Sequence, residues 1–122
     1  MKKIVLIVDD EERVRKAHAD VVTSLGYDFE LAYDGLDCLK KLETTKFNLI
    51  IMGIKMPKMD GVEALTRIAK AYEHLPVIIV SALIFENTEA DLKELGAFAV
   101  FRKPVHLNDL VDAIEQALQE FH

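Results

Sequence analysis

The sequence is poor in the residues that cross-link or interrupt a chain. It contains one cysteine, Cys38, no tryptophan, three prolines and five glycines among 122 residues. A single cysteine cannot form an internal disulfide bond, which excludes a disulfide-stabilised secreted scaffold and fits a reducing cytoplasm. Cys38 falls within an apolar helical pattern, so we expect it to lie in the core and not to act as a reactive thiol.

Long apolar runs and basic clusters are also lacking. No stretch approaches the roughly 18 apolar residues that span a bilayer, and the acidic residues 9–12 end the first apolar run too early for a signal peptide. The formal net charge is −6 without a basic stripe, which argues against nucleic-acid binding. We therefore expect a cytoplasmic protein that binds neither membranes nor nucleic acid. The four scattered histidines have no metal-site spacing and are predicted to be surface residues: His18, His74, His106 and His122.

Short apolar runs alternate instead with segments of helical periodicity. Strands are predicted over residues 4–8, 29–33, 47–52, 77–80 and 98–101, and helices over 11–25, 35–43, 61–73, 88–96 and 107–121. Continuous apolar runs are typical of strands that are covered on both faces. This order predicts one α/β domain over residues 1–122, a doubly wound five-stranded parallel sheet with right-handed crossovers.

Polar residues follow four of these predicted strands. Asp9 and Asp10 follow the first, Ser81 the fourth and Lys103 the fifth, and Gly53 follows the third. Ligands bind beyond the carboxyl ends of strands in open parallel sheets, so we expect these positions to meet. Neighbouring carboxylates suit Mg²⁺, and a lysine with a hydroxyl can bind phosphoryl oxygens. Any one of these residues alone would more often be an ordinary turn, strand-end or surface residue.

The segment Met56-Pro57-Lys58-Met59-Asp60-Gly61 is the most specific pattern. Together with the strand-end residues and the Lys103-Pro104 dipeptide, it resembles the receiver domain of two-component response regulators over essentially the whole chain. The resemblance implies the flavodoxin-like strand order 2-1-3-4-5, which periodicity leaves open. It also implies a phosphoryl-transfer partner, either a histidine kinase or a phosphotransfer protein, and a non-enzymatic signalling role.

The same resemblance assigns roles to individual residues. Asp9 and Asp10 match the acids that hold Mg²⁺, with Asp10 as the direct ligand, and the backbone carbonyl of Lys55 matches the main-chain ligand. Ser81 matches the switch hydroxyl, and Lys103 the lysine that contacts the phosphoryl group. Val100 matches the second switch position, which is often aromatic in the family. The resemblance also implies a cis peptide bond between Lys103 and Pro104.

Gly53 stands where the family has its phospho-acceptor aspartate. Glycine can neither form an acyl phosphate nor ligate a metal, so we expect a phosphorylation-defective receiver with weakened Mg²⁺ binding. Two histories remain open: one substitution in an otherwise competent receiver, or a natural pseudo-receiver that acts by protein binding alone. The retained Asp9, Asp10, Ser81 and Lys103 favour the first, because drift usually erodes several positions.

Two further alternatives concern partners and enzymes. The apolar loop Leu83-Ile84-Phe85 either packs on the core or forms a contact patch for a target or a second receiver. The alternative function from the enzyme class is a phosphatase with an aspartyl nucleophile, or a flavin carrier on a similar sheet. An acidic first loop would repel a flavin phosphate, and the Met56 to Gly61 loop fits a receiver better than a phosphatase.

Overall fold

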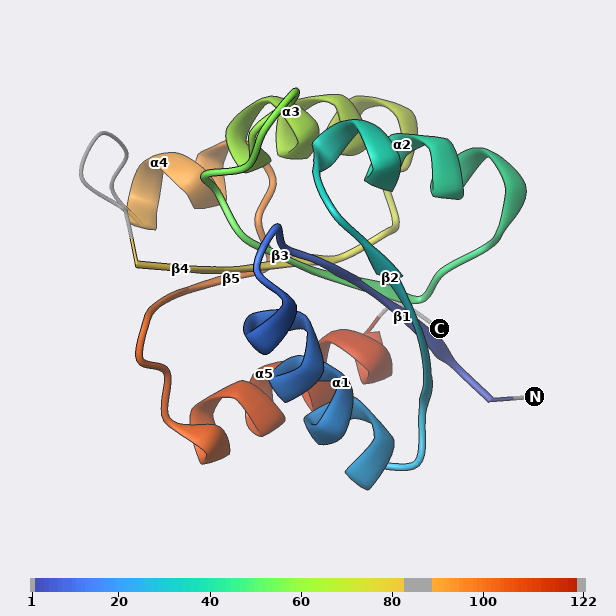
Figure 1. Ribbon diagram of the computed structural model, residues 1–122, viewed down its shortest axis with the longest axis vertical. Coiled ribbons are helices and arrows are strands. Elements are labelled where there is room, and N and C mark those ends of the chain that lie inside the picture. Colours follow the sequence, from blue (N-terminus) through green and yellow to red (C-terminus); the bar gives the residue numbers. More distant parts are fainter. Residues whose placement is uncertain (1, 83–88, 121–122) are drawn as a thin grey trace.

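A computed structural model describes residues 2–82 and 89–120 (Figure 1). Strands and helices alternate along the described chain. The strands are β1 (Ile4–Val8), β2 (Asp28–Ala32), β3 (Leu49–Met52), β4 (Val77–Ser81) and β5 (Ala99–Arg102). The helices are α1 (Glu12–Ser24), α2 (Gly35–Thr44), α3 (Gly61–Ala71), α4 (Glu89–Glu94) and α5 (Leu107–Glu120).

The strands form one parallel sheet in the order β2-β1-β3-β4-β5. This confirms the order that the resemblance implied. Helices α1 and α5 cover one face, and α2, α3 and α4 cover the other (Figure 1). Each face buries its own apolar cluster, one containing Leu6 and Ile50 and the other containing Ile7 and Ile51. Alternate residues of the central strands therefore feed opposite clusters, as the period of two in a strand requires.

The central strands are buried on both sides, as their continuous apolar runs predicted. Every residue of β3 and β4 is buried, whereas the edge strand β2 exposes its first three residues. Strand β3 ends at Met52, so Gly53 lies just beyond the strand. Glycine at this position therefore does not weaken a strand interior, since Gly53 belongs to the following loop.

Helix α1 buries one residue that the sequence analysis placed on the surface. Its buried residues are His18, Ala19 and Val22, and Val21 and Leu25 pack against the same core cluster. The prediction that His18 is a surface residue is therefore wrong. His18 precedes Val22 by four residues, which places both on the same side of the helix.

Side-chain caps start two of the helices. The Asp34 carboxylate accepts a hydrogen bond from the Asp37 amide at 2.8 Å, and that of Asp60 accepts one from the Glu63 amide at 2.9 Å. Asp60 and Glu63 have the spacing of a capping box, of which this bond is one half. The Glu63 carboxylate instead pairs with Arg67 at 2.8 Å.

Two other predictions concern Cys38 and the membrane. Cys38 is a buried free thiol in α2, and burial raises its pKa to about 12, which confirms a core residue. Within residues 2–82 and 89–120, no helix is both long enough and apolar enough to cross a bilayer. The loop Leu83-Ile84-Phe85, the predicted helix start at Thr88, and Phe121 and His122 lie outside the described residues.

Candidate functional site

The strand-end residues meet at the carboxyl edge of the sheet. They line a small cavity of about 60 Å³, together with Glu11, Ile54 and Ala82. The members predicted from the sequence are Asp9, Asp10, Gly53, Lys55, Ser81 and Lys103. Four separate strand ends supply these residues because all strands run the same way, which places their carboxyl ends together.

Asp9 is the most tightly held member. It is only 4% exposed, and its two carboxylate oxygens have different partners. Oδ1 accepts a hydrogen bond from the Glu11 amide at 3.0 Å, and Oδ2 lies 3.4 Å from Nζ of Lys103. The Asp9 backbone carbonyl also accepts a hydrogen bond from Nη1 of Arg15 at 2.7 Å. The buried carboxylate is therefore paired and hydrogen-bonded, as a buried charge must be.

The Asp9 carboxylate lies directly over Gly53. A Cβ atom placed on Gly53 would come within 2.7 Å of Asp9 Oδ2 and 3.8 Å of the Val80 carbonyl oxygen. Any side chain at position 53 therefore requires the Asp9 carboxylate to move aside. Because the obstructing atom is a side-chain oxygen and not backbone, a rotation of Asp9 that loosens its contact with Lys103 would relieve the clash.

The loop after β3 folds back on itself beside the cavity. The Gly61 amide donates to the Ile54 carbonyl at 2.6 Å, and the Gly53 amide donates to the Val8 carbonyl at 3.0 Å. A Cβ atom on Gly61 would collide with the carbonyl oxygen of Gly53. Glycine at position 61 therefore allows the first residue of α3 to pack against the backbone of Gly53.

Ser81 and Lys103 lie on adjacent strand ends. The Lys103 amide donates to the Ser81 carbonyl at 3.0 Å, and Ser81 is buried. The peptide bond between Lys103 and Pro104 is cis. Val100 is buried in β5 opposite Ile79 and is not among the residues that line the cavity.

Three residues around this site were not predicted from the sequence to belong to it. Arg15 holds the Asp9 backbone and lies 4.7 Å from the centre of the exposed Tyr33 ring. Burial lowers the pKa of His18, the charge of Asp9 opposes that effect, and the charge of Lys103 adds to it. Glu11 lines the cavity. Glu11 could have been found because it follows Asp10 directly, but Arg15 and His18 carried no such signal.

A metal ion fits the donor set. Asp9, Asp10 and Glu11 each offer a carboxylate oxygen, and these oxygens lie within 4.8 Å of one another. Mg²⁺ prefers oxygen ligands, and clustered carboxylates supply both the atoms and the negative charge that it needs. A bound cation would offset the charge of a phosphoryl group at this edge.

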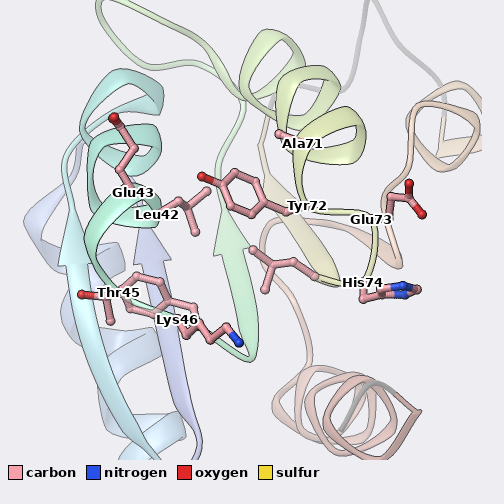
Figure 2. Close-up of a pocket in the computed structure, with 10 residues that line it drawn as sticks. Leu42, Glu43, Thr45, Lys46, Ala71, Tyr72, Glu73 and His74 are labelled. Atoms are coloured by element: carbon pink, nitrogen blue, oxygen red, sulfur yellow. The ribbon is translucent and has the colours of Figure 1, made fainter.

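A larger groove of about 920 Å³ lies between the C-terminal ends of α2 and α3 (Figure 2). Its apolar lining includes Leu42, Phe47 and Tyr72. The charged side chains at its rim are exposed, and Glu73 and His74 point away from it in Figure 2. The groove therefore lacks the convergent polar groups that a chemical site requires.

The chain belongs to the family of response regulator receiver domains, which it matches over residues 5–115. It is 33% identical over 118 residues to the sporulation initiation phosphotransferase F of Bacillus subtilis, with 97% of this chain and 95% of that protein covered. Receiver domains act in two-component signalling, where they interact with histidine kinases or phosphotransfer proteins. Other curated relatives are longer, and the chain spans little more than half of their length.

Solved structures agree with this assignment. A CheY-like receiver domain protein from Methanospirillum hungatei is 32% identical and superimposes with a TM-score of 0.91 over 98% of this chain and 96% of that one. The response regulator TrrA from Thermotoga maritima, solved in complex with Mg²⁺ and BeF, is 27% identical with a TM-score of 0.86. The superposition with TrrA covers 95% of this chain and 99% of that one.

Proposed function

We propose that this protein is a receiver module of two-component or phosphorelay signalling that cannot accept a phosphoryl group because Gly53 occupies the acceptor position. The observation that carries the proposal is the placement of Gly53. It lies at the end of β3, inside the cavity that Asp9, Asp10, Ser81 and Lys103 line. The ends of β1, β4 and β5 supply these side chains, and the end of β3 supplies none.

The missing side chain removes the nucleophile of the reaction. Transfer to a receiver requires a carboxylate that attacks phosphorus and becomes an acyl phosphate. The buried carboxylate nearest to Gly53 is Asp9, and it is already engaged by Lys103 and by the Glu11 amide. We therefore infer that the chain stays unmodified when it meets a phosphoryl donor.

The metal-binding part of the site is retained in weakened form. In this proposal Asp9, Asp10 and the backbone carbonyl of Lys55 hold Mg²⁺, with Asp10 as the direct ligand. Ser81 and Lys103 would contact phosphoryl oxygens, and Val100 takes the second switch position. Loss of one carboxylate ligand lowers the affinity for Mg²⁺ because ligand charge helps to set it.

The proposed partners follow from the family. They are a histidine kinase or a phosphotransfer protein, with a second receiver as a further candidate, and neither nucleic acid nor a membrane is included. The net charge of −6 supports the exclusion of nucleic acid, and the single buried thiol of Cys38 supports a reducing cytoplasm. We assign the protein a signalling role and no enzymatic one.

A second candidate is a pseudo-receiver that acts by phosphorylation-independent binding. The ion pair between Asp9 and Lys103, at 3.4 Å, favours it because the lysine has a partner without any phosphoryl group. The two candidates differ in one respect. If Gly53→Asp changes the affinity for a captured partner in the presence of a phosphoryl donor, the receiver is regulated by phosphorylation. An unchanged affinity supports binding alone.

Intact mass after treatment with acetyl phosphate and Mg²⁺ tests the main proposal. The protein, the Gly53→Asp variant and a Gly53→Asn control are treated in parallel. Only Gly53→Asp should gain one phosphoryl group, because asparagine restores the size of the side chain without its nucleophile. A phosphoryl group on the unaltered protein would contradict the proposal, and its absence from all three would favour the pseudo-receiver.

A further inference from the structure

Glu11 has a carboxylate that its own helix does not use. The residue is the N-cap of α1, yet its side chain makes no capping hydrogen bond. Within the part of the chain that the structure describes, no lysine or arginine pairs with it. Its carboxylate lies within 4.8 Å of those of Asp9 and Asp10, and it lines the cavity at the carboxyl edge of the sheet.

Gly53 leaves the metal site one carboxylate short. The two remaining acids, Asp9 and Asp10, carry two negative charges, and Lys103 offsets part of that charge from 3.4 Å away. Oxygens that share one Mg²⁺ lie at most about 4.2 Å apart, from bond lengths of about 2.1 Å. The present spacing of the three carboxylates therefore needs to shrink by less than about 1 Å. An exposed glutamate side chain can make such a movement at little cost.

We propose that Glu11 is a ligand of the divalent cation and replaces the carboxylate that Gly53 cannot supply. The inference rests on the metal site of the proposed function. With Glu11 included, three carboxylates and the Lys55 carbonyl would hold the cation. Asp9 would have to serve the cation beside its present partners, since Oδ1 accepts from the Glu11 amide and Oδ2 lies 3.4 Å from Nζ of Lys103.

Metal binding to two matched variants tests the proposal. The chain offers a close control, because Glu12 is the next residue, is also exposed, and stands outside the carboxylate cluster. Glu11→Gln and Glu12→Gln each remove one negative charge from the start of α1. Mn²⁺ binding is followed by electron paramagnetic resonance of the free ion, and Mg²⁺ binding by calorimetry. Neither measurement depends on phosphorylation.

A ligand and a nearby charge give different results. We expect Glu11→Gln to raise the Kd for Mn²⁺ roughly tenfold and Glu12→Gln to raise it less than about twofold. Equal effects of the two variants would overturn the proposal, because they would show that Glu11 only attracts the cation through its charge and does not coordinate it. The thermal midpoint without metal should stay unchanged in Glu11→Gln, since no capping bond is lost.

A double-mutant cycle with Gly53→Asp tests replacement. If Glu11 substitutes for the missing ligand, Glu11→Gln should weaken Mn²⁺ binding less in the Gly53→Asp background than in the unaltered protein. An equal loss in both backgrounds would contradict the replacement. This result is independent of the phosphorylation test, because a chain with Gly53 stays unmodified whether or not Glu11 binds the ion.

Discussion

The two ends of the sheet contrast in size and in chemistry. The cavity at the carboxyl ends holds about 60 Å³ but gathers two aspartates, a glutamate, a serine and two lysines. The groove beside the C-terminal ends of α2 and α3 holds about 920 Å³, with an apolar lining and with Glu73 and His74 pointing away from it (Figure 2). Convergence of polar groups therefore identifies the site here better than volume does, because parallel strands bring their carboxyl ends together.

The largest expected effect comes from Gly61, which supports the small cavity. A Gly61→Ala substitution should destabilise the protein by about 3 kcal/mol, because the added Cβ collides with the Gly53 carbonyl oxygen. That oxygen is a backbone atom, so the clash can be relieved only by a shift of the backbone. Chemical denaturation measures this loss. A Gly26→Ala variant serves as control for backbone strain alone, because Gly26 has positive φ but open space around its Cβ position. A loss no larger than that of the control would contradict the collision.

A smaller loss is expected from the groove. Tyr72 is half-buried and packs against the core cluster that contains Leu65 and Ile68. Tyr72→Ala should cost about 2 kcal/mol by exposing apolar area, and it should leave Mn²⁺ affinity unchanged. Denaturation and metal titration on the same sample separate the two quantities. A change in Mn²⁺ affinity would contradict the conclusion that the groove takes no part in metal binding at the other end of the sheet.

Residue 53 itself should matter little for stability. Restoring the aspartate crowds a third carboxylate against Asp9, but the displaced Asp9 side chain can rotate. The thermal midpoints of the protein and of Gly53→Asp should therefore agree within about 8 °C, or on the order of 1–2 kcal/mol for a domain of this size. Scanning calorimetry without metal measures the difference. A larger gap would show that position 53 is a structural element.

The smallest effect concerns His18, a buried residue of α1. Burial lowers its pKa in the folded protein, so the unfolded chain binds the proton first as the pH falls. Stability should decrease as the pH drops through the ordinary histidine range near 6.5, by at most about 1.4 kcal/mol per pH unit. His18→Gln should flatten this part of the curve. An identical pH dependence in the variant would exclude His18 as its source.

Much of the fold was predictable, for identifiable reasons. Continuous apolar runs such as Ile4 to Val8 mark strands covered on both faces, and the capping acids Asp34 and Asp60 mark helix starts. The strand order came from the family resemblance. The burial of His18 was not predictable, because apolar periodicity does not assign a polar residue to the core.

The site was predictable as a set of positions but not as a set of contacts. Strand ends identified Asp9, Ser81 and Lys103, since topology alone brings them together. That Asp9 would lie over Gly53 and pair with Lys103 depends on side-chain rotamers, which no sequence pattern specifies. Glu11 follows Asp10 in the sequence, but that its carboxylate lies within 4.8 Å of those of Asp9 and Asp10 also depends on rotamers.

The central claim is that the carboxyl edge is a receiver site that lacks one side chain. Its most direct test is the thermal shift that beryllofluoride adds to the effect of Mg²⁺ alone, since beryllofluoride is a phosphoryl mimic that needs the acceptor carboxylate as a ligand. At 100 times its Kd such a ligand stabilises by about 2.7 kcal/mol, or on the order of 10 °C here. The account predicts that shift for Gly53→Asp and none for the unaltered protein. Equal shifts in both proteins, or none in either, would contradict it.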